Sequence, residues 1–379
     1  GDTAIDLSAL HQLGYLSGIE LPEDVFLQDT LNDFITLGQP TWRAVRNRIA
    51  EIFDEKNREM QSNPEHLEVV LHPVSEIQML LPVFTQDYTD FYSSREHAEN
   101  VGTMFRGKEN ALMPNWLHLP VGYHGRSSSI IVSGESIRRP KGQTMPDGAE
   151  KPVFGPSKLL DFELEMAFIT TDGKPLGESI GVEEAEDYIF GMVLFNDWSA
   201  RDLQKWEYVP LGPFLGKNFA SSISPWVVTL DALEPYRTES PAQDPEPLDY
   251  LKSHGKKTFD IQLEVLIQPQ GKEAASVCHS NFRYLYWNIS QQLAHHTVNG
   301  CNINVGDMMA SGTISGPEKE NFGSMLELSW RGSRSVQVGN EERKFINDGD
   351  TVIMRGHCDN GQVRIGFGEV SSRVLPAMP

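Results

Sequence analysis

The stretch KLLDFELEMAF, residues 158–168, alternates between apolar and acidic side chains. Its acids, Asp161, Glu163 and Glu165, share one parity, and a period of two predicts a β-strand with three carboxylates on one face. Like charges on one face repel each other unless a cation lies against them, and Ca²⁺ or Mg²⁺ binds carboxylate oxygens. A strand with a solvated acidic face is the alternative, and the stretch alone does not decide between the two.

A second stretch in the chain serves as a comparison. Residues 259–265, FDIQLEV, alternate in the same way, and nothing there indicates a metal. The metal hypothesis for residues 158–168 therefore depends on chemistry elsewhere in the chain.

Composition limits the classes of function. The chain has 379 residues, 39% hydrophobic residues and 18 Phe, which is enough for a large core and a smaller second domain. The net charge of -21 argues against binding to nucleic acid or to an anionic membrane surface. If the substrate is an anion, the protein must gather cations locally.

The cysteines and the hydropathy pattern bear on location. Cys278, Cys301 and Cys358 are far apart and form no CxxC, so we expect reduced thiols in a reducing, cytoplasmic compartment. No run approaches the roughly 18 apolar residues that span a bilayer, and we see no signal peptide.

Residues 1–82 form a small module in our interpretation, and residues 83–379 a larger one. We expect a helix from about Thr41 to Glu55 and a strand at residues 77–81 that ends at Pro82. Residues 1–7 resemble the second half of a hairpin, so we expect the first strands of the module to be missing from this numbering.

From residue 125 onward short strands and glycine turns predominate. Expected strands include residues 128–132 and 190–195, with a helix at residues 288–299 that stops at Gly300 and a hairpin turn at Asn360-Gly361. This pattern is typical of an α+β or mainly β domain and differs from an alternating β-α pattern.

Residues 87–97, DYTDFYSSREH, combine an acid, a capping signal and a histidine. Ser93 to Glu96 fits a capping box, which places His97 in the first helical turn, where the imidazole is kept neutral and able to accept a proton. If Asp90 is a turn residue and His97 lies on the surface, the stretch has no catalytic meaning. On this stretch alone the second interpretation is favoured.

Residues 190–208 predict a buried strand that ends at Asp197, followed by a helix. Arg201, Gln204 and Tyr208 would line one helical face that could hold an anionic ligand. An ordinary cap with a solvated helix face is the alternative. We favour the ligand-binding interpretation because the apolar strand directs Asp197 inward.

Two further stretches place a charge in apolar surroundings. Residues 212–218, GPFLGKN, fail the phosphate-loop pattern, but Lys217 would need an anion if it is buried; a solvated turn is equally compatible. Residues 324–330, SMLELSW, read as a strand in which a buried Glu327 would need a partner such as a histidine, whereas an edge strand with Glu327 outward is slightly favoured.

Other candidate sites fail. We find no GxSxG nucleophile elbow. His295 and His296 are adjacent in a predicted helix, so their rings diverge, and packing or capping roles are favoured over metal binding.

Several motifs resemble the fumarylacetoacetate hydrolase family over nearly the whole chain, in its long, eukaryotic-like form. They are YTDFYSS at 88–94, FRGKEN at 105–110, LPVGYHGR at 119–126, the Glu163/Glu165 strand, NDWSARD at 196–202 and SGTISG at 311–316. The resemblance implies an α+β, mainly β protein with a small SH3-like N-terminal barrel and a C-terminal mixed β-roll or sandwich, assembled as a homodimer.

The resemblance also implies an activity. The expected reaction is metal-dependent hydrolysis of the C–C bond of 4-fumarylacetoacetate, a dicarboxylate diketone, to fumarate and acetoacetate, the last step of tyrosine and phenylalanine degradation. A related acylpyruvase or diketone hydrolase, or an oxaloacetate decarboxylase of the same superfamily, is the alternative.

By the same resemblance, individual residues receive roles. Ca²⁺ and/or Mg²⁺ would bind Asp90, Glu163, Glu165 and Asp197, with Lys217 and Ser221 beside a second, ancillary cation. His97 would be the general base and Glu327 its orienting partner. The oxyanion site would consist of Arg201, Gln204 and Lys217, and the substrate contacts of Tyr92, Arg106, Tyr123, Gln204, Tyr208 and Thr313.

Overall fold

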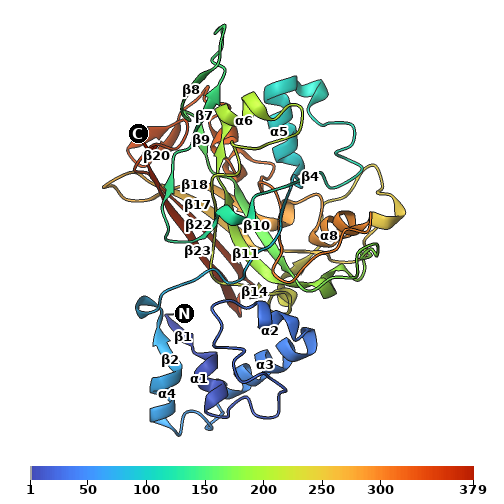
Figure 1. The fold of residues 1–379 in the computed structure, drawn as a ribbon, viewed down its shortest axis with the longest axis vertical. Coiled ribbons are helices and arrows are strands. Elements are labelled where there is room, and N and C mark those ends of the chain that lie inside the picture. The colour runs from blue at the N-terminus through green and yellow to red at the C-terminus, as the bar shows by residue number, and fades with distance from the viewer. Residues whose placement is uncertain (1) are drawn as a thin grey trace. The chain divides into compact units, whose positions relative to one another are not determined.

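The computed structural model describes residues 2–379 and divides the chain into two compact units, one ending at Phe84 and the other spanning Thr85–Pro379. Gly1, the first residue of the expected hairpin, lies outside the described residues. The two units are described separately below (Figure 1).

The N-terminal unit is mainly helical. Its helices are α1 (Leu7–Gln12), α2 (Asn32–Thr36), α3 (Gln39–Ile52) and α4 (Pro64–Val70), and they bury a small core that includes Leu10, Leu16, Ile52, Met60 and Val70. Strand β1 (Thr3–Ile5) pairs antiparallel with β2 (Leu71–Pro73). Among the described residues of this unit, these two strands are the only ones that pair. The expected SH3-like barrel is therefore not confirmed.

The prediction of a strand at residues 77–81 is wrong. Ile77, Met79 and Leu81 are half-buried while Gln78 and Leu80 are exposed, so the alternation itself is present. The segment nevertheless has no regular secondary structure and pairs with no strand among residues 2–379. Alternation predicts a strand only where a neighbouring strand offers hydrogen-bond partners.

The C-terminal unit contains two large sheets. The main sheet has the order β4-β3-β19-β10-β11-β13-β5, and β14 also pairs with β11. Its strands are β3 (Tyr88–Phe91), β4 (Gly122–His124), β5 (Ile130–Val132), β10 (Leu164–Thr170), β11 (Ile189–Asp197), β13 (Ser221–Ile223), β14 (Val228–Thr229) and β19 (Met308–Ala310).

The second sheet has the order β18-β17-β22-β23-β6 (Figure 1). Its strands are β6 (Ile137–Arg138), β17 (Gln262–Gln268), β18 (Ala275–Asn281), β22 (Thr351–Asp359) and β23 (Arg364–Leu375). Leu164 and Leu194 of the main sheet belong to the same hydrophobic core as Leu263 and Met354 of the second sheet. Packing the apolar faces of two sheets against each other leaves the opposite face of the main sheet for the site.

Short strand pairs and helices complete this unit. The pairs are β9 (Leu160–Asp161) with β12 (Ser199–Ala200), β7 (Lys141–Thr144) with β8 (Val153–Pro156), β15 (Arg237–Thr238) with β16 (Thr258–Phe259), and β20 (Val336–Val338) with β21 (Glu341–Arg343). The helices are α5 (Arg95–Arg106), α6 (Arg201–Glu207), α7 (Leu230–Leu233), α8 (Ile289–Thr297) and α9 (Met325–Leu328).

The mainly β architecture agrees with the expectation from sequence, as do the helix that Asn288 caps and the Asn360-Gly361 turn between β22 and β23. The predicted strand at residues 158–168 is interrupted at Phe162 and Glu163, so that it forms β9 and β10. All three of its acids are buried, which excludes the solvated acidic face. On the comparison strand β17, by contrast, Glu264 remains partly exposed.

Helix α5 begins one residue later than the predicted capping box requires. Ser94 is the N-cap, and its hydroxyl accepts a hydrogen bond from the backbone N–H of His97 at 3.2 Å. Glu96 therefore does not occupy the position that closes the predicted box. His97 is still in the first turn, buried at 3% exposure.

We expect Gly102→Ala to destabilise the protein by about 2–3 kcal/mol. Gly102 lies on α5, and a Cβ there would lie 1.8 Å from the backbone oxygen of Ala111, which cannot move as a side chain can. Urea unfolding would measure the effect, with Gly155→Ala as the control because a Cβ there meets nothing within 4 Å. Equal unfolding midpoints for the two variants would contradict this account of α5 packing.

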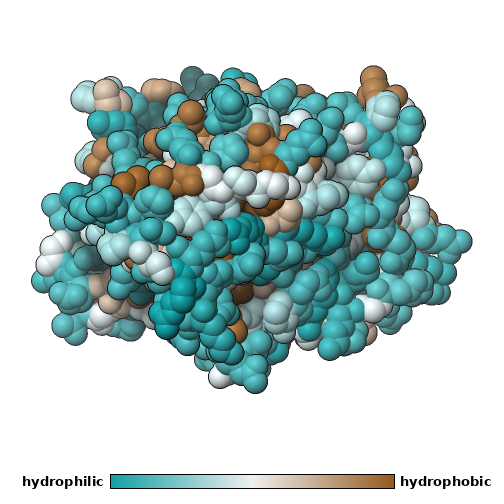
Figure 2. Space-filling model, turned by 90° about the horizontal axis from the view of Figure 1, so that it is seen from below, coloured by the Kyte–Doolittle hydropathy of each residue, from teal (hydrophilic) through white to brown (hydrophobic). Residues whose placement is uncertain are grey.

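The face of the molecule seen in Figure 2 carries mostly hydrophilic side chains, with hydrophobic residues in small groups. Within residues 2–379, every helix is too short or too polar to cross a bilayer.

Candidate metal centre and active site

Strand register brings four distant acids to one face of the main sheet. Asp90 of β3 pairs with Ala310 of β19, and Ala310 pairs with Ala167 of β10. Because paired residues point to the same face, Asp90 lies on the face of Ala167 and therefore on that of Glu165.

The neighbouring strand supplies the next acid. Glu165 pairs with Phe195 of β11, and Asp197 follows two residues later on the same face. Glu163, two residues before Glu165, has the same parity. The four side chains thus converge, although the first and the last of them, Asp90 and Asp197, are more than 100 residues apart in the sequence.

The converging acids form a buried cluster. Asp90, Glu163, Glu165 and Asp197 each offer an oxygen, and these oxygens all lie within 4.8 Å of one another. Their exposures are 3%, 5%, 0% and 0%. Asp90 Oδ1 and Glu165 Oε1 find no hydrogen-bond donor in the described chain. Buried carboxylate oxygens without donors fit a hard divalent cation, which binds several such oxygens at once.

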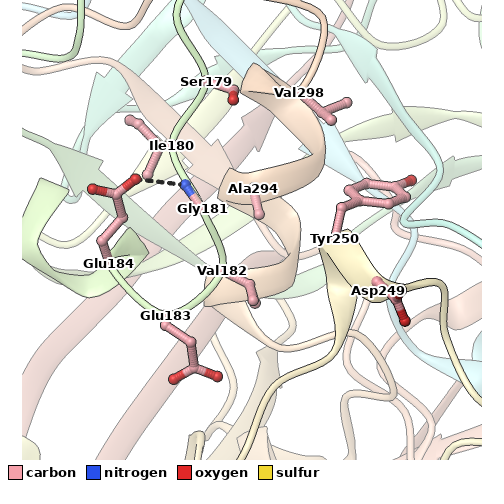
Figure 3. Close-up of a pocket in the computed structure, with 10 residues that line it drawn as sticks. All are labelled: Ser179, Ile180, Gly181, Val182, Glu183, Glu184, Asp249, Tyr250, Ala294 and Val298. Atoms are coloured by element: carbon pink, nitrogen blue, oxygen red, sulfur yellow. Dashed lines mark hydrogen bonds between the residues drawn. The ribbon is translucent and has the colours of Figure 1, made fainter.

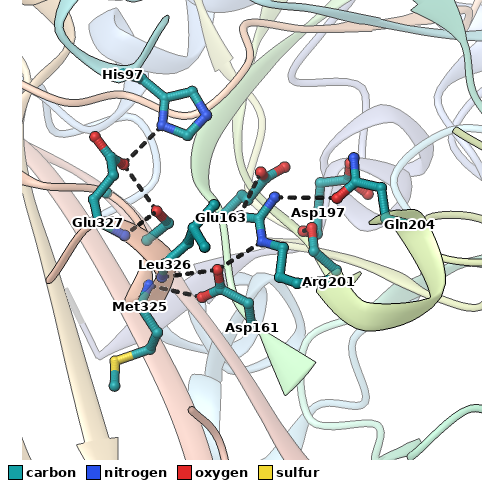
Figure 4. Close-up of polar contacts among 12 residues, drawn as sticks. His97, Asp161, Glu163, Asp197, Arg201, Gln204, Met325, Leu326 and Glu327 are labelled. Carbon is teal, nitrogen blue, oxygen red and sulfur yellow. Dashed lines mark hydrogen bonds and ion pairs between the residues drawn. The ribbon is translucent and has the colours of Figure 1, made fainter. Parts of the chain in front are cut away.

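Two cationic side chains enter the cluster. Lys217, 6% exposed, forms ion pairs with Glu163 and Asp197, which excludes the solvated turn considered from the sequence. Arg201 pairs through Nη2 with Glu163 Oε1 at 2.8 Å (Figure 4). Although burial works to raise it, the charges of Lys217 and Arg201 hold the pKa of Glu163 below its ordinary value.

Negative charge still exceeds positive charge in this region. Burial, followed by repulsion from neighbouring carboxylates, raises the pKa of Asp90 and of Glu165 well above their usual values. A divalent cation would remove that repulsion, so the donor set and its charge both fit Ca²⁺ or Mg²⁺.

Binding of Ca²⁺ or Mg²⁺ should therefore compete with protons, with release of protons at a pH where these carboxyls are protonated. Asp90 and Glu165 have raised pKa values in the protein without metal, so lowering the pH favours their protonated forms and weakens binding, whereas raising the pH strengthens it. Titration calorimetry in buffers of different ionisation enthalpy measures the release. Binding heat and affinity independent of buffer and pH would contradict the prediction.

A buried histidine–carboxylate pair lies beside the cluster. His97 Nδ1 and Glu327 Oε2 are 2.7 Å apart, and both side chains are at most 3% exposed. The two interpretations that the isolated stretches favoured, a surface His97 and an outward Glu327 on an edge strand, are wrong. Glu327 lies on the short helix α9, because Ser324 caps a helical turn where we expected a strand.

The contacts of Glu327 favour its ionised form. Burial works to raise the pKa of Glu327, but the charge of His97 and hydrogen bonds from His97, Asn100 and Ser324 outweigh it, so that this pKa lies below its usual value. When His97 is neutral and its Nδ1–H donates a hydrogen bond to the ionised Glu327, Nε2 is left to accept a proton.

Sequence reasoning missed the residues that hold Glu327. Asn100 Nδ2 donates to Oε1 at 3.0 Å, and the hydroxyls of Ser324 and Ser315 donate to Oε2 at 2.8 and 3.0 Å. Asn100 follows His97 by three residues on α5, a spacing that was available as a signal once His97 was a candidate.

Most of the other predicted site residues also contact this region. Tyr123 and Ser221 donate to the two oxygens of Asp197, at 3.1 and 3.0 Å. Gln204 Oε1 lies 3.4 Å from Arg201 Nη1, and the Thr313 hydroxyl is buried without a partner in the described chain. The ring of Tyr92 meets that of His97 edge-on, with centroids 5.2 Å apart.

Two predicted substrate residues are not brought into contact with the cluster. Arg106, at the end of α5, donates to the backbone oxygens of Asn110 and Ala111. Tyr208 follows α6 and is 53% exposed. His295 and His296 contact Tyr250 and Thr89 respectively, in agreement with packing roles.

A separate hollow of about 460 Å³ lies between residues 179–184, Asp249-Tyr250 and helix α8 (Figure 3). None of its lining residues belongs to the acidic cluster. Two of its rim carboxylates already form ion pairs, Glu184 with Lys174 and Asp249 with Lys252. The hollow is therefore separate from the candidate metal centre.

The fold and the cluster together define a mainly β protein with a buried carboxylate site that could bind a metal. Residues 87–375 match the family described as fumarylacetoacetate (FAA) hydrolase C-terminal, and residues 1–82 match fumarylacetoacetase N-terminal. The chain belongs to the fumarylacetoacetate hydrolase family, which confirms the resemblance seen in the sequence.

Named relatives match over the full length. The fumarylacetoacetase of Bos taurus is 55% identical over 380 residues, covering 100% of this chain and 91% of the relative. That of Dictyostelium discoideum is 55% identical over 383 residues, covering 100% and 90%. A solved fumarylacetoacetate hydrolase from Exiguobacterium antarcticum shares the fold, with a TM-score of 0.54 and 18% identity over 92% of this chain and 89% of that one.

Proposed function

We propose that the chain hydrolyses the C–C bond of 4-fumarylacetoacetate to give fumarate and acetoacetate, the last step of tyrosine and phenylalanine degradation. Relatives that are named fumarylacetoacetase and are 55% identical over the whole chain support this activity. The observation that carries the proposal is the buried His97–Glu327 pair beside the acidic cluster, because the reaction needs a base next to a site that polarises a carbonyl.

His97 is the proposed general base. With Nδ1–H donated to Glu327, Nε2 takes a proton from water, and the hydroxide so formed attacks the carbonyl at the scissile bond. Glu327 stabilises the imidazolium and keeps the ring in one orientation. The proton then passes to the departing acetoacetate carbon, which restores neutral His97.

Arg201, Gln204 and Lys217 are the proposed oxyanion donors. They reach the region from α6 and from the turn before β13, so their donors are fixed before the alkoxide forms. A donor of this kind contributes about 3 kcal/mol to lowering the barrier. A bound Ca²⁺ or Mg²⁺ would be held by Asp90, Glu163, Glu165 and Asp197 and would supply Lewis acidity that polarises the substrate oxygens. Lys217 and Ser221 would lie beside an ancillary cation.

The remaining assignments concern the dianionic substrate. Tyr92, Tyr123, Tyr208 and Thr313 are proposed contacts, and Arg106 with Arg201 and Lys217 would offset the two substrate carboxylates. Tyr208 and Arg106 have no described contact with the cluster, so they would meet a part of the substrate away from the metal site.

We further propose that residues 83–379 are the catalytic β-roll domain and that residues 1–82 belong to an SH3-like module. We propose a homodimer as the assembly. The free thiols of Cys278, Cys301 and Cys358 support a reducing, cytoplasmic compartment.

A substrate comparison tests the function. We expect purified protein to turn over fumarylacetoacetate with a kcat/KM at least about tenfold above that for acylpyruvates, since the cationic side chains match a second carboxylate. Decarboxylation of oxaloacetate is measured in parallel. Turnover of acylpyruvates or oxaloacetate alone would assign the chain to a sister activity of the superfamily.

A further inference from the structure

Asp161 has the parity of the metal-site acids but belongs to a different set of contacts. It is fully buried, on β9, and does not belong to the cluster of converging oxygens. Its oxygens face helix α9 and the guanidinium of Arg201 (Figure 4).

Three donors converge on this one carboxylate. Oδ1 accepts from the backbone N–H of Met325 at 2.7 Å, and Oδ2 accepts from the backbone N–H of Leu326 at 3.0 Å. Oδ2 also accepts from Arg201 Nε at 2.8 Å. A carboxylate can accept all three hydrogen bonds. The amide of an asparagine has only one acceptor oxygen, and its NH₂ group would face N–H donors.

The two groups that Asp161 joins have different chemical tasks. Leu326 directly precedes Glu327, so the bonds to α9 fix the turn from which Glu327 reaches His97. On the other side, the bond to Nε fixes the plane of the Arg201 guanidinium and leaves its Nη atoms facing Glu163 and Gln204. No other described carboxylate accepts bonds from both α9 and Arg201.

We propose that Asp161 is a positioning residue that ties the Arg201 oxyanion donor to helix α9, and so sets the His97–Glu327 base at a fixed distance from the developing negative charge. The proposal rests on the proposed function for its catalytic meaning. The positioning of His97 through α9, however, does not depend on which substrate the protein uses.

Asp350 offers a matched control. It is 1% exposed, and its carboxylate accepts from Arg343 Nε at 2.9 Å, from Arg343 Nη2 at 3.0 Å and from the backbone N–H of Asn347 at 2.9 Å. Asp350→Asn therefore removes a buried aspartate–arginine–backbone network of the same kind, with no candidate catalytic side chain attached.

The test compares Asp161→Asn with Asp350→Asn in the full chain. We expect Asp161→Asn to lower kcat by about 10–100-fold, the usual effect of removing a residue that orients a catalytic group, with a smaller change in KM. The proton resonance of His97 Nδ1–H, identified by its absence in His97→Ala, should shift or disappear. Asp350→Asn should lower the unfolding midpoint but leave both kcat and that resonance as in the wild type.

Other outcomes overturn the proposal. An unchanged His97 resonance in Asp161→Asn would show that Asp161 does not position His97 through α9. An equal loss of kcat in Asp161→Asn and Asp350→Asn would show a general effect of destabilisation. If Asp161→Asn does not fold, Asp161→Glu retains the charge but displaces the carboxylate by one methylene, and wild-type kcat with an unshifted resonance in that variant would overturn the link. If the wild type does not hydrolyse fumarylacetoacetate, the proposed function fails, and the resonance alone then decides the role of Asp161.

Discussion

Replacing His97 with alanine should lower kcat for fumarylacetoacetate hydrolysis by at least about 100-fold while the protein keeps its fold and its metal. The imidazole is buried and its Nδ1 lies 2.7 Å from Glu327 Oε2, so Nε2 is the ring nitrogen left to take a proton from water. None of the four clustered carboxylates is a hydrogen-bond partner of His97 among the described contacts, so metal content should not depend on it.

Steady-state kinetics and elemental analysis of the same sample measure both parts of this expectation. His295→Ala is the control, because His295 lies on helix α8 and hydrogen-bonds Tyr250 outside the candidate site. Turnover of His97→Ala within a few-fold of the wild type would remove the general-base assignment. Loss of metal together with activity would show that His97 acts in maintaining the cluster.

Lys217→Met should lower kcat by about 100–1000-fold, because it removes a proposed oxyanion donor. It should also lower the free energy of unfolding of the metal-free protein by about 3–5 kcal/mol, since removal of one partner from a buried ion pair leaves uncompensated charge. Here Asp197 would lose the cation with which it pairs, and Glu163 would keep only its ion pair with Arg201.

Kinetics and urea unfolding after chelation of metal measure the two effects. Lys174→Met removes an ammonium from a partly exposed surface pair with Glu184, and its effect on unfolding should be much smaller than that of Lys217→Met. If Lys217→Met is as stable and as active as Lys174→Met, Lys217 has neither of the proposed roles.

The sequence predicted well which acids share one face of a strand. It predicted poorly which distant segments come together at the site. Period-two alternation at residues 158–168 placed Glu163 and Glu165 on one face, because adjacent residues of a strand necessarily alternate. It could not place Asp90 and Asp197 beside them. That proximity depends on the pairing of β3, β19, β10 and β11, and register between distant strands is set by packing and not by local sequence.

The errors have local physical causes. Residues 324–330 were interpreted as a strand because short apolar runs are compatible with either a strand or a buried helix. Ser324 three residues before Glu327 was an available capping signal, and it decides for helix α9. Residues 77–81 alternate but have no neighbouring strand. Asp161 was grouped with the metal-site acids by parity, although its backbone lies on β9, beyond the interruption that separates β9 from β10.

The residue types alone left several alternatives open. The resemblance to a known family favoured one of each, but only as an expectation. Whether Lys217 was buried, and whether His97 had a carboxylate partner, depended on contacts between segments 54 and 230 residues apart. No local pattern carries such information. The role assigned to Arg106 comes from resemblance alone, whereas that of Tyr208 comes from resemblance and from its helical spacing with Arg201 and Gln204. Both roles remain predictions.

We expect the four buried carboxylates to hold a divalent cation on which hydrolysis depends. Metal content by elemental analysis, followed through dialysis against a chelator and measured beside turnover in the same samples, tests it most directly. We predict at least one Ca²⁺ or Mg²⁺ per chain at full activity, loss of turnover in proportion to loss of metal, and recovery when the ion is returned. Full turnover of fumarylacetoacetate by protein freed of metal would contradict the claim.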